Sequence, residues 1–373
     1  MQLVVAVFIG IIVYAIQSRL YRRLWDHKLF VELNFNEEYV VAGGSGTLTE
    51  CVTNAKKLPL PILHVKFSAP KSFTFEDAAN SSVTDYYHRN DVYSVMGEQR
   101  IKRTFAFKAG KRGYYSISAM NIISKSLFLN GTFAKTDDCD TCIYVLPEKL
   151  TIEAGRELIA TVTGEIQARR SLVEDPFLFR GMREYMSTDP VRSINWKASA
   201  RQESPIVNLY GYTAEHRVKL MLNVEPNVMV RADYMYELCV SLASTLACKL
   251  IETGVPVEIV SNGLDELTNE TGTVEWGASK EHELTCDRYL ARINGSAGQE
   301  YFNGLLRDEL KAADSSITYV IISSYMKEDM VSLLDAMTAA GADLYMIAPY
   351  FDIDDARVVR DYIRGMEVKL DEA

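Results

Sequence analysis

The chain has 373 residues, a length that suggests two or three domains, and its 48% of apolar residues can form sizeable cores. Its formal net charge of −10 argues against general nucleic-acid binding, which needs a basic face. The six cysteines are ordinary usage for a chain of this size and do not suggest a disulfide framework.

Residues 1–18, MQLVVAVFIGIIVYAIQS, contain no charged side chain. As a helix they would extend about 27 Å, close to the hydrocarbon thickness of a bilayer. Arg19, Arg22 and Arg23 follow at once, whereas a signal peptide carries its positive charge before the apolar run. We therefore predict a single-pass transmembrane anchor over residues 1–24 of a cell-membrane protein. The positive-inside rule places the rest of the chain in the cytoplasm, and a buried soluble helix is the alternative.

Residues 28–147 are predicted to form a β-sandwich of immunoglobulin type. Segments such as LFVELNFN and QRIKRTFAFKAG alternate apolar and polar residues and are rich in strand-forming types. Turn residues, among them Gly43, Gly44 and Gly110, separate these segments at short intervals. The polar segment 80–91 is predicted to be a long surface loop.

Residues 148–215 are predicted to be a connector, because a semi-regular pattern at its start becomes strongly charged. Asp189 and Pro190 form a helix-start signal, since the carboxylate can accept from exposed amides and proline suits the first helical position. The segment VRSINWKASAR is then expected to form a helix of about three turns. Arg192 and Trp196 would share a face of that helix, where the guanidinium can lie on the indole ring.

From residue 216 to 370, strand patterns alternate with helical ones, which predicts a parallel sheet covered by helices on both faces. The strands are VKLMLNV, VPVEIVS, ITYVIISS and ADLYMIAP, and the helical segments include residues 233–254 and the late segment DDARVVRDYIRGM. The fold class expected for the whole chain is therefore α+β multidomain: a membrane helix, a β-sandwich and a C-terminal α/β sheet.

Ligands of such a sheet bind at the carboxyl ends of its strands, and the first of these ends carries Asn223, Glu225 and Asn227. This segment resembles the von Willebrand factor type A domain, in which a DxSxS pattern binds a divalent cation at the same place. The three side chains still offer oxygen atoms, but a hard cation usually requires more carboxylate than Glu225 provides. We expect a degenerate metal site and no cofactor, with a bound divalent cation as the alternative. Nucleotide binding is not expected, because the chain has neither a GxGxxG nor a GxxxxGKS loop.

Residues 181–201 concentrate charged and aromatic side chains and resemble the signature of the family called domain of unknown function 58. That signature runs glycine, any residue, Arg-Glu-Tyr, then Asp, Arg, Ile, any residue, Trp and Ser-Ala-Arg. The matching residues are Gly181, Arg183, Glu184, Tyr185, Asp189, Arg192, Ile194, Trp196, Ser199, Ala200 and Arg201. The resemblance implies a von Willebrand type A-like C-terminal domain and a MoxR-type AAA+ ATPase as partner. Many members have two membrane segments where this chain has one.

Three interpretations of the signature stay open. In the first interpretation the signature is the docking surface of a membrane-anchored interaction or assembly protein that is not an enzyme. In the second it is a polar brace between domains. In the third interpretation Glu184 and Asp189 serve a hydrolase or nuclease as general base or metal ligands, while Arg183 or Arg192 binds phosphate. We favour the first two, because the sequence shows no complete nucleophile–base constellation.

Overall fold

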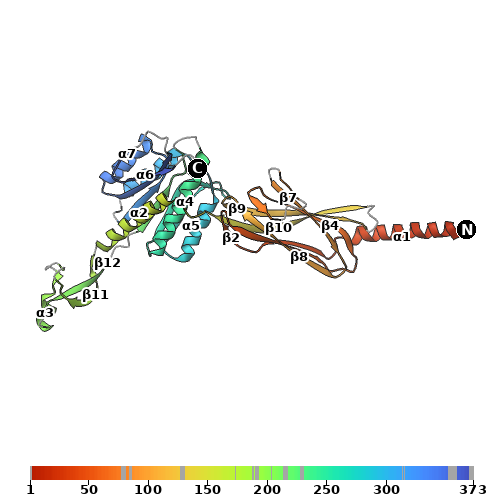
Figure 1. Cartoon of the computed structure of the whole chain (residues 1–373), viewed down its shortest axis with the longest axis horizontal. Helices are drawn as coiled ribbons and strands as arrows, with labels where there is room; N and C mark the ends of the chain where they lie inside the picture. Colours follow the sequence, from red (N-terminus) through yellow and green to blue (C-terminus); the bar gives the residue numbers. More distant parts are fainter. Residues whose placement is uncertain are drawn as a thin grey trace. The chain divides into compact units, whose positions relative to one another are not determined.

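The computed structural model describes residues 2–76, 81–83, 86–126, 131–172, 174–186, 189, 193–202, 204–212, 217–226, 231–312, 314, 316–351 and 359–368. The chain divides into two compact units, residues 1–148 and 149–373 (Figure 1). The first unit holds helix α1 and the strands β1 to β10, and the second holds the remaining helices and strands.

The first unit is a β-sandwich, which confirms that prediction. One sheet has the order β1-β3-β8-β5 and the other the order β2-β10-β9-β4-β7-β6. Side chains such as Leu48, Phe107 and Ile122 fill the core between the sheets. The strand bounds are Leu29–Phe35 for β1, Tyr39–Val41 for β2, Ser45–Asn54 for β3, Leu60–Pro70 for β4, Phe73–Phe75 for β5, Ser81–Val83 for β6, Tyr86–Val95 for β7, Gln99–Ala109 for β8, Gly113–Lys125 for β9 and Thr132–Leu146 for β10.

Helix α1 (Gln2–Leu24) is joined to the sandwich through aromatic side chains at its carboxyl end. Tyr21 and Trp25 are buried in the sandwich core, and their ring centroids lie 5.7 Å and 6.0 Å from that of Phe133. The Tyr21 hydroxyl lies 3.0 Å from Ser124 Oγ. Farther toward the amino end the large apolar side chains are exposed, as at Phe8, which is 64% exposed. The carboxyl end of the helix is therefore buried through aromatic side chains, whereas the apolar side chains toward its amino end are exposed.

Where side chains are described along the chain, one helix is long and apolar enough to cross a membrane: α4 (Ala232–Glu252) of the second unit. Its Leu242, Leu246 and Leu250 are fully buried, as in the core helix of a soluble domain. The side chains of residues 1–7 lie outside the described ones, and the anchor over residues 1–18 stays a prediction.

The segment 80–91, expected to be a surface loop, contributes instead to strands β6 and β7. Arg89 and Asp91 of β7 are buried in the sandwich, where Arg89 Nε donates to Asp91 Oδ2 at 2.6 Å. The guanidinium also lies 3.7 Å from the centroid of the Phe105 ring. The loop prediction is wrong because an ion pair and a cation–π contact allow these charged side chains to be buried.

The second unit is built on a sheet with the strand order β15-β14-β13-β17-β18-β19. Neighbouring strands from β14 to β19 are parallel, which confirms the predicted parallel sheet, and β15 adds an antiparallel edge. The order reverses between β13 and β17, the switch point of a doubly wound fold. The strand bounds are Arg217–Leu222 for β13, Val257–Asp265 for β14, Thr271–Gly277 for β15, Ile317–Ile322 for β17, Asp343–Phe351 for β18 and Ile363–Val368 for β19, and the short β16 (Ile293–Ser296) pairs with β14.

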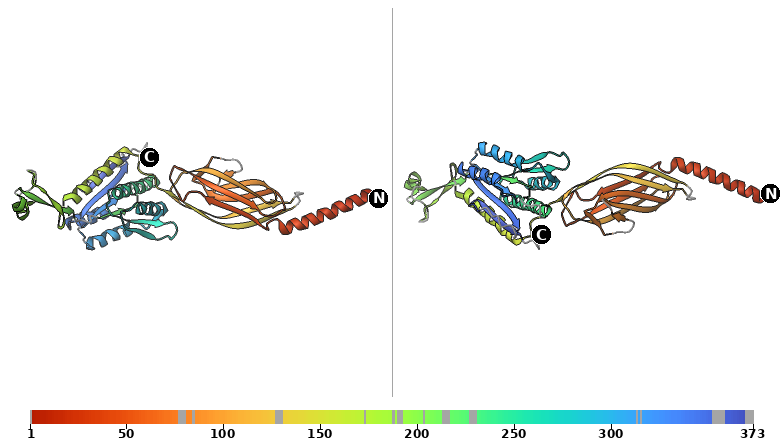
Figure 2. Two further views of the ribbon diagram at one scale, coloured as in Figure 1. Left: turned by 90° about the horizontal axis from the view of Figure 1, so that it is seen from below. Right: turned by 90° about the horizontal axis from the view of Figure 1, so that it is seen from above.

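Helices cover both faces of this sheet, as Figure 2 shows. Residues Leu220 and Leu222 of β13 pack with α2, α4 and α5, whereas Met221 between them packs with α6 and α7 on the opposite face. This alternation is the period of a strand buried on both sides. The helix bounds are Glu153–Leu172 for α2, Lys280–Arg292 for α5, Gln299–Ala312 for α6 and Glu328–Ala339 for α7.

Two segments of the second unit differ from their predicted form. The end of DDARVVRDYIRGM, expected to be helical, is strand β19, which pairs in parallel with β18 from Ile363 opposite Met346 onward. Sheet pairing and the burial of Met366 and Val368 outweigh the helical pattern of the sequence. The first part of the predicted connector is α2, whose Ile159, Val162 and Ile166 lie in the core.

A buried carboxylate in the sandwich predicts how stability changes with pH. Glu50 of β3 is fully buried, and Arg89, Asp91 and Tyr93 from β7 and Arg103 from β8 are the charged or titratable groups that act on it. Burial and then the negative charge of Asp91 raise the pKa of Glu50 from 4.5 to about 8.

Because the folded protein keeps the proton on Glu50 while the unfolded chain loses it, stability should fall as the pH rises from about 4.5 to about 8. Each pKa unit of such a shift corresponds to about 1.4 kcal/mol. Glu50→Gln keeps the shape without ionising, so its melting temperature should fall less over this range than that of the wild type. Glu76→Gln, at an exposed site, is the control, and equal pH dependence of Glu50→Gln and the wild type would contradict the account.

Candidate functional site

Most of the signature residues lie on a small arm of the second unit, made of β11 (Glu174–Glu184), α3 (Trp196–Gln202) and β12 (Ile206–Tyr212). We refer to these residues as the signature arm (Figure 1). Strands β11 and β12 are antiparallel, with Arg183 opposite Val207. Beyond the strand pairs, Tyr185 N donates to Pro205 O at 2.8 Å. The arm therefore presents the described part of the signature on and beside a pair of antiparallel strands.

Within the arm, Arg183 holds Asp189. Its Nη1 and Nη2 donate to Asp189 Oδ2 and Oδ1 at 2.6 Å each, and Met186 N donates to Oδ2 at 2.9 Å. The hydrogen bond from Arg183 is the main reason that the pKa of Asp189 lies below its usual value. A bidentate pair of this kind constrains direction as well as distance. Arg183 and Asp189 thus brace the arm internally.

Helix α3 begins at Trp196, whereas the predicted helix already included Ser193, Ile194 and Asn195, so its predicted start is wrong. Asn195 caps it, because its Oδ1 accepts a hydrogen bond from Ala198 N at 3.0 Å. The Asp189 carboxylate, expected to be the cap, is engaged by Arg183 instead. Pro190, Val191 and Arg192 lie outside the described residues, and so does the predicted stacking of Arg192 on Trp196.

The cap also ties α3 to β12. Asn195 Nδ2 donates to Asn208 Oδ1 at 2.8 Å. Ser199 Oγ donates to Asn195 O at 2.8 Å and accepts from Ile206 N at 2.9 Å. Polar groups of Asn195 and Ser199 therefore hold the helix against the strand.

Other side chains of the arm point into solvent. Met182, Met186 and Trp196 are 52%, 54% and 67% exposed, although large apolar side chains are usually buried. Glu184, the last residue of β11, is also exposed, and so are Lys197 and Arg201 on α3. Exposed methionine and tryptophan are typical of protein-binding surfaces.

At the switch point of the sheet, the predicted metal-site residue Asn223 is completely buried in a network of amides. Its Nδ2 donates to Gln299 Oε1 at 2.8 Å and to Ser323 Oγ at 3.0 Å. Its Oδ1 accepts from Asn262 Nδ2 at 2.8 Å and from Glu225 N at 3.0 Å. The Asn262 side-chain amide thus donates to Asn223 Oδ1, the oxygen atom that a cation would otherwise bind.

Glu225, the second predicted metal-site residue, contacts Asn223 through its backbone N–H and not through its carboxylate. The Glu225 carboxylate accepts a hydrogen bond from Ser296 Oγ at 2.9 Å, and Asn227 lies outside the described residues. In the described part of the chain, no group of three or more His, Cys, Asp or Glu side chains could hold a metal ion.

Ser323 was noted from the sequence as a polar strand end, but Asn262 and Gln299 were not predicted, because they come from separate segments of the chain. The signal available was that polar residues, Asn262 and Ser323 among them, stand at the carboxyl-terminal parts of β14 and β17.

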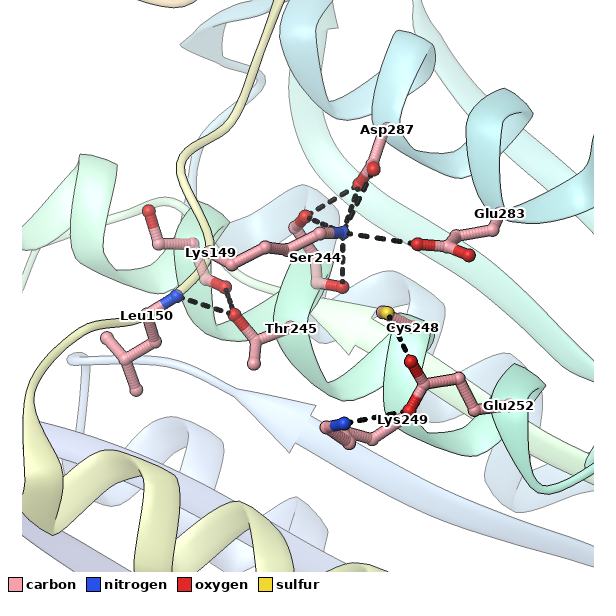
Figure 3. A network of polar contacts seen from close by, with 10 residues as sticks. Lys149, Leu150, Ser244, Thr245, Cys248, Lys249, Glu252, Glu283 and Asp287 are labelled. Carbon is pink, nitrogen blue, oxygen red and sulfur yellow. Dashed lines mark hydrogen bonds and ion pairs between the residues drawn. The ribbon is translucent and has the colours of Figure 1, made fainter. Parts of the chain in front are cut away.

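A third polar cluster, shown in Figure 3, was not predicted at all. Lys149 Nζ donates to Ser244 Oγ at 2.8 Å and lies 2.9 Å from Asp287 Oδ2, while Ser244 Oγ donates to Asp287 Oδ1 at 2.6 Å. Burial raises the pKa of Asp287. Ser244 is fully buried, and the cluster ties the start of the second unit to α4 and α5.

Residues 181–346 match the family described as protein of unknown function DUF58. The match starts at Gly181, the first residue of the signature, and supports the resemblance found from the sequence. It covers the arm from the end of β11 and the sheet through part of β18, and the chain matches no curated protein.

Solved structures similar to part of the chain include two cohesins. The non-cellulosomal cohesin of Archaeoglobus fulgidus is 12% identical, with a TM-score of 0.22, and covers 34% of this chain and 96% of its own. A type II cohesin domain from the cellulosome of Acetivibrio cellulolyticus is 9% identical, with a TM-score of 0.24, and covers 31% and 95%.

The CARDB domain of the PF1109 protein from Pyrococcus furiosus, solved in complex with di-metal ions, is 17% identical, with a TM-score of 0.19 and coverage of 30% and 91%. At TM-scores this low, these likenesses carry no argument about function.

The buried amide network predicts a measurable loss of stability. Asn223→Ala should lower the free energy of unfolding of the second unit by about 1 to 3 kcal/mol, because Gln299 and Asn262 lose buried partners. Denaturant unfolding measures the change, and Asn294→Ala at an exposed site is the control. Unchanged stability of Asn223→Ala would contradict the network.

Proposed function

We propose that this protein is a membrane-anchored interaction or assembly protein and that the signature arm is its docking element. The observation that carries the proposal is the exposure of Met182, Met186 and Trp196 on an arm whose shape is held by Arg183 and Asp189. Tryptophan often provides a large share of binding energy at an interface, and methionine adapts to different partners. A braced arm also reduces the entropy lost on binding.

The anchoring part of the proposal rests on α1. Its exposed apolar side chains, among them Phe8, Ile12 and Ile16, suit a bilayer better than water. Arg19, Arg22 and Arg23 follow the apolar stretch, so a single pass would leave the bulk of the chain in the cytoplasm.

The partner in this proposal is a MoxR-type AAA+ ATPase, as the family resemblance implies. A von Willebrand type A-like second unit belongs to the same proposal. It is supported by the doubly wound strand order with one antiparallel edge and by the position of Asn223 and Ser323 at the switch point. No cofactor is part of the proposal.

The alternative of a hydrolase or nuclease at the signature receives less support. Both carboxylate oxygens of Asp189 already accept hydrogen bonds from Arg183, which leaves the carboxylate poorly placed to act as a base. Glu184 is exposed at the end of β11, and its described hydrogen bond is made by its backbone oxygen, which accepts from Arg183 Nη1 at 3.0 Å.

The test is capture of the partner from cells that contain the protein. After crosslinking, the tagged full chain is purified in detergent as wild type, Trp196→Ala and Phe30→Ala, the last removing an exposed aromatic ring from the sandwich. We expect a AAA+ ATPase with the wild type and with Phe30→Ala, and at least about tenfold less with Trp196→Ala.

Hydrogen exchange of the arm should be the same in Trp196→Ala as in the wild type, because the exposed ring does not hold the arm. Recovery of no ATPase with the wild type would contradict the partner. Equal recovery with Trp196→Ala would contradict docking through the arm.

A further inference from the structure

A lysine is buried without a partner where α1 enters the sandwich. Lys56 is 9% exposed, and its Nζ has no hydrogen-bond partner within the described parts of the chain. The charges that act on it are those of Asp26 and Lys135, which oppose each other. Buried ammonium groups are normally paired, because an unpaired charge away from water is costly. Lys56 therefore points to an anion as its partner.

The position of Lys56 is set by the backbone around it. The loop between β3 and β4 is held on one side by Ala55 N, which donates to Lys28 O at 3.0 Å just after α1. On the other side Glu98 N, in the turn between β7 and β8, donates to Lys56 O at 3.0 Å. Three connections of the sandwich meet at this lysine, so its backbone is not free to move the ammonium group into solvent.

Two further contacts fix the same meeting point. Asn54 Nδ2 donates to Met96 O at 2.8 Å, which ties the β7–β8 turn to the loop. A Cβ on Gly97 of that turn would lie 2.4 Å from Lys57 O, so only glycine permits this approach. The turn also exposes Met96 next to the loop.

The surface around Lys56 is basic. Arg22, Arg23, Lys28 and Lys57 are exposed on the segments that meet there, against the carboxylates of Asp26 and Glu98. The surface thus opposes the net charge of −10 of the whole chain. Burial lowers the pKa of Lys56 to about 8, and a bound anion would raise it again.

The membrane span predicted at residues 1–18 sets how far this basic surface lies from the bilayer. Helix α1 continues to Leu24, so its Arg22 and Arg23 stand about 6 to 8 Å beyond residue 18. Headgroups occupy roughly 5 to 7 Å on each side of the hydrocarbon. The basic surface would therefore face the headgroups of the cytoplasmic leaflet, which carries anionic lipid.

We propose that Lys56 and the exposed cations around it bind the phosphate of an anionic phospholipid headgroup. The inference rests on the proposed function, because it requires α1 to lie in the membrane. The protein would then hold the membrane in two ways, through the apolar helix α1 and through a lipid contact made by the sandwich.

The test uses the full chain in detergent micelles, so that lipid binding is measured whether or not α1 spans a membrane in cells. Native mass spectrometry compares the retention of phosphatidylglycerol and phosphatidylcholine. We expect the wild type to prefer phosphatidylglycerol and Lys56→Met to bind it about fivefold more weakly. Lys71→Met, at the opposite end of β4, is the matched control and should behave as the wild type. Lys56→Arg should retain the preference.

Lys56→Gln provides a second variant in case Lys56→Met does not fold. Equal lipid preference of the wild type and the folded Lys56 variants would overturn the proposal. Inorganic phosphate distinguishes the source of the anion: competition by phosphate at equal concentration would show a site for free phosphate and also overturn it. Alkaline extraction of membranes tests the anchor separately, so its failure and a failure of lipid binding are distinct results.

Discussion

The burial of Tyr21 and Trp25 in the sandwich is the interaction that fixes α1, the helix of the proposed membrane anchor, to a folded domain. A helix joined to a domain by a flexible linker could leave or enter a membrane without affecting the domain. Here the last turn of α1 and the residue after it are part of the sandwich core, so the direction of the helix is coupled to the domain. The same packing places the loop that carries Lys56 beside the point where α1 ends.

The signature arm shows a division of roles among residues that are neighbours in sequence. Arg183, Asp189, Asn195 and Ser199 use their polar groups on one another or on nearby backbone. Trp196, Met182 and Met186 contribute little to that packing and are left in solvent. The question whether the signature braces or docks therefore has a residue-by-residue answer: its polar members brace the arm, and its apolar members are available to a partner.

Regular patterns were predictable from the sequence, and contacts between distant segments were not. The apolar runs of β13, β17 and β18 and the long helix α4, which is followed by Gly254 at φ 72°, agree with simple periodicity. Arg89 was misplaced in a loop because the ring of Phe105 that covers it lies on another strand. The start of α3 was misplaced because Arg183 engages Asp189 and leaves capping to Asn195. The amide network around Asn223 joins three other segments, and polar residues at strand ends indicate Asn262 and Ser323 but not Gln299, which lies on α6.

The most direct test of the account is whether the protein behaves as an integral membrane protein. Membranes from cells that contain the full chain are extracted with alkaline carbonate, and the chain is followed in the pellet and the supernatant. The exposed apolar side chains of α1 predict that it stays in the pellet and is released only by detergent. Release of most of the chain into the supernatant would contradict membrane anchoring.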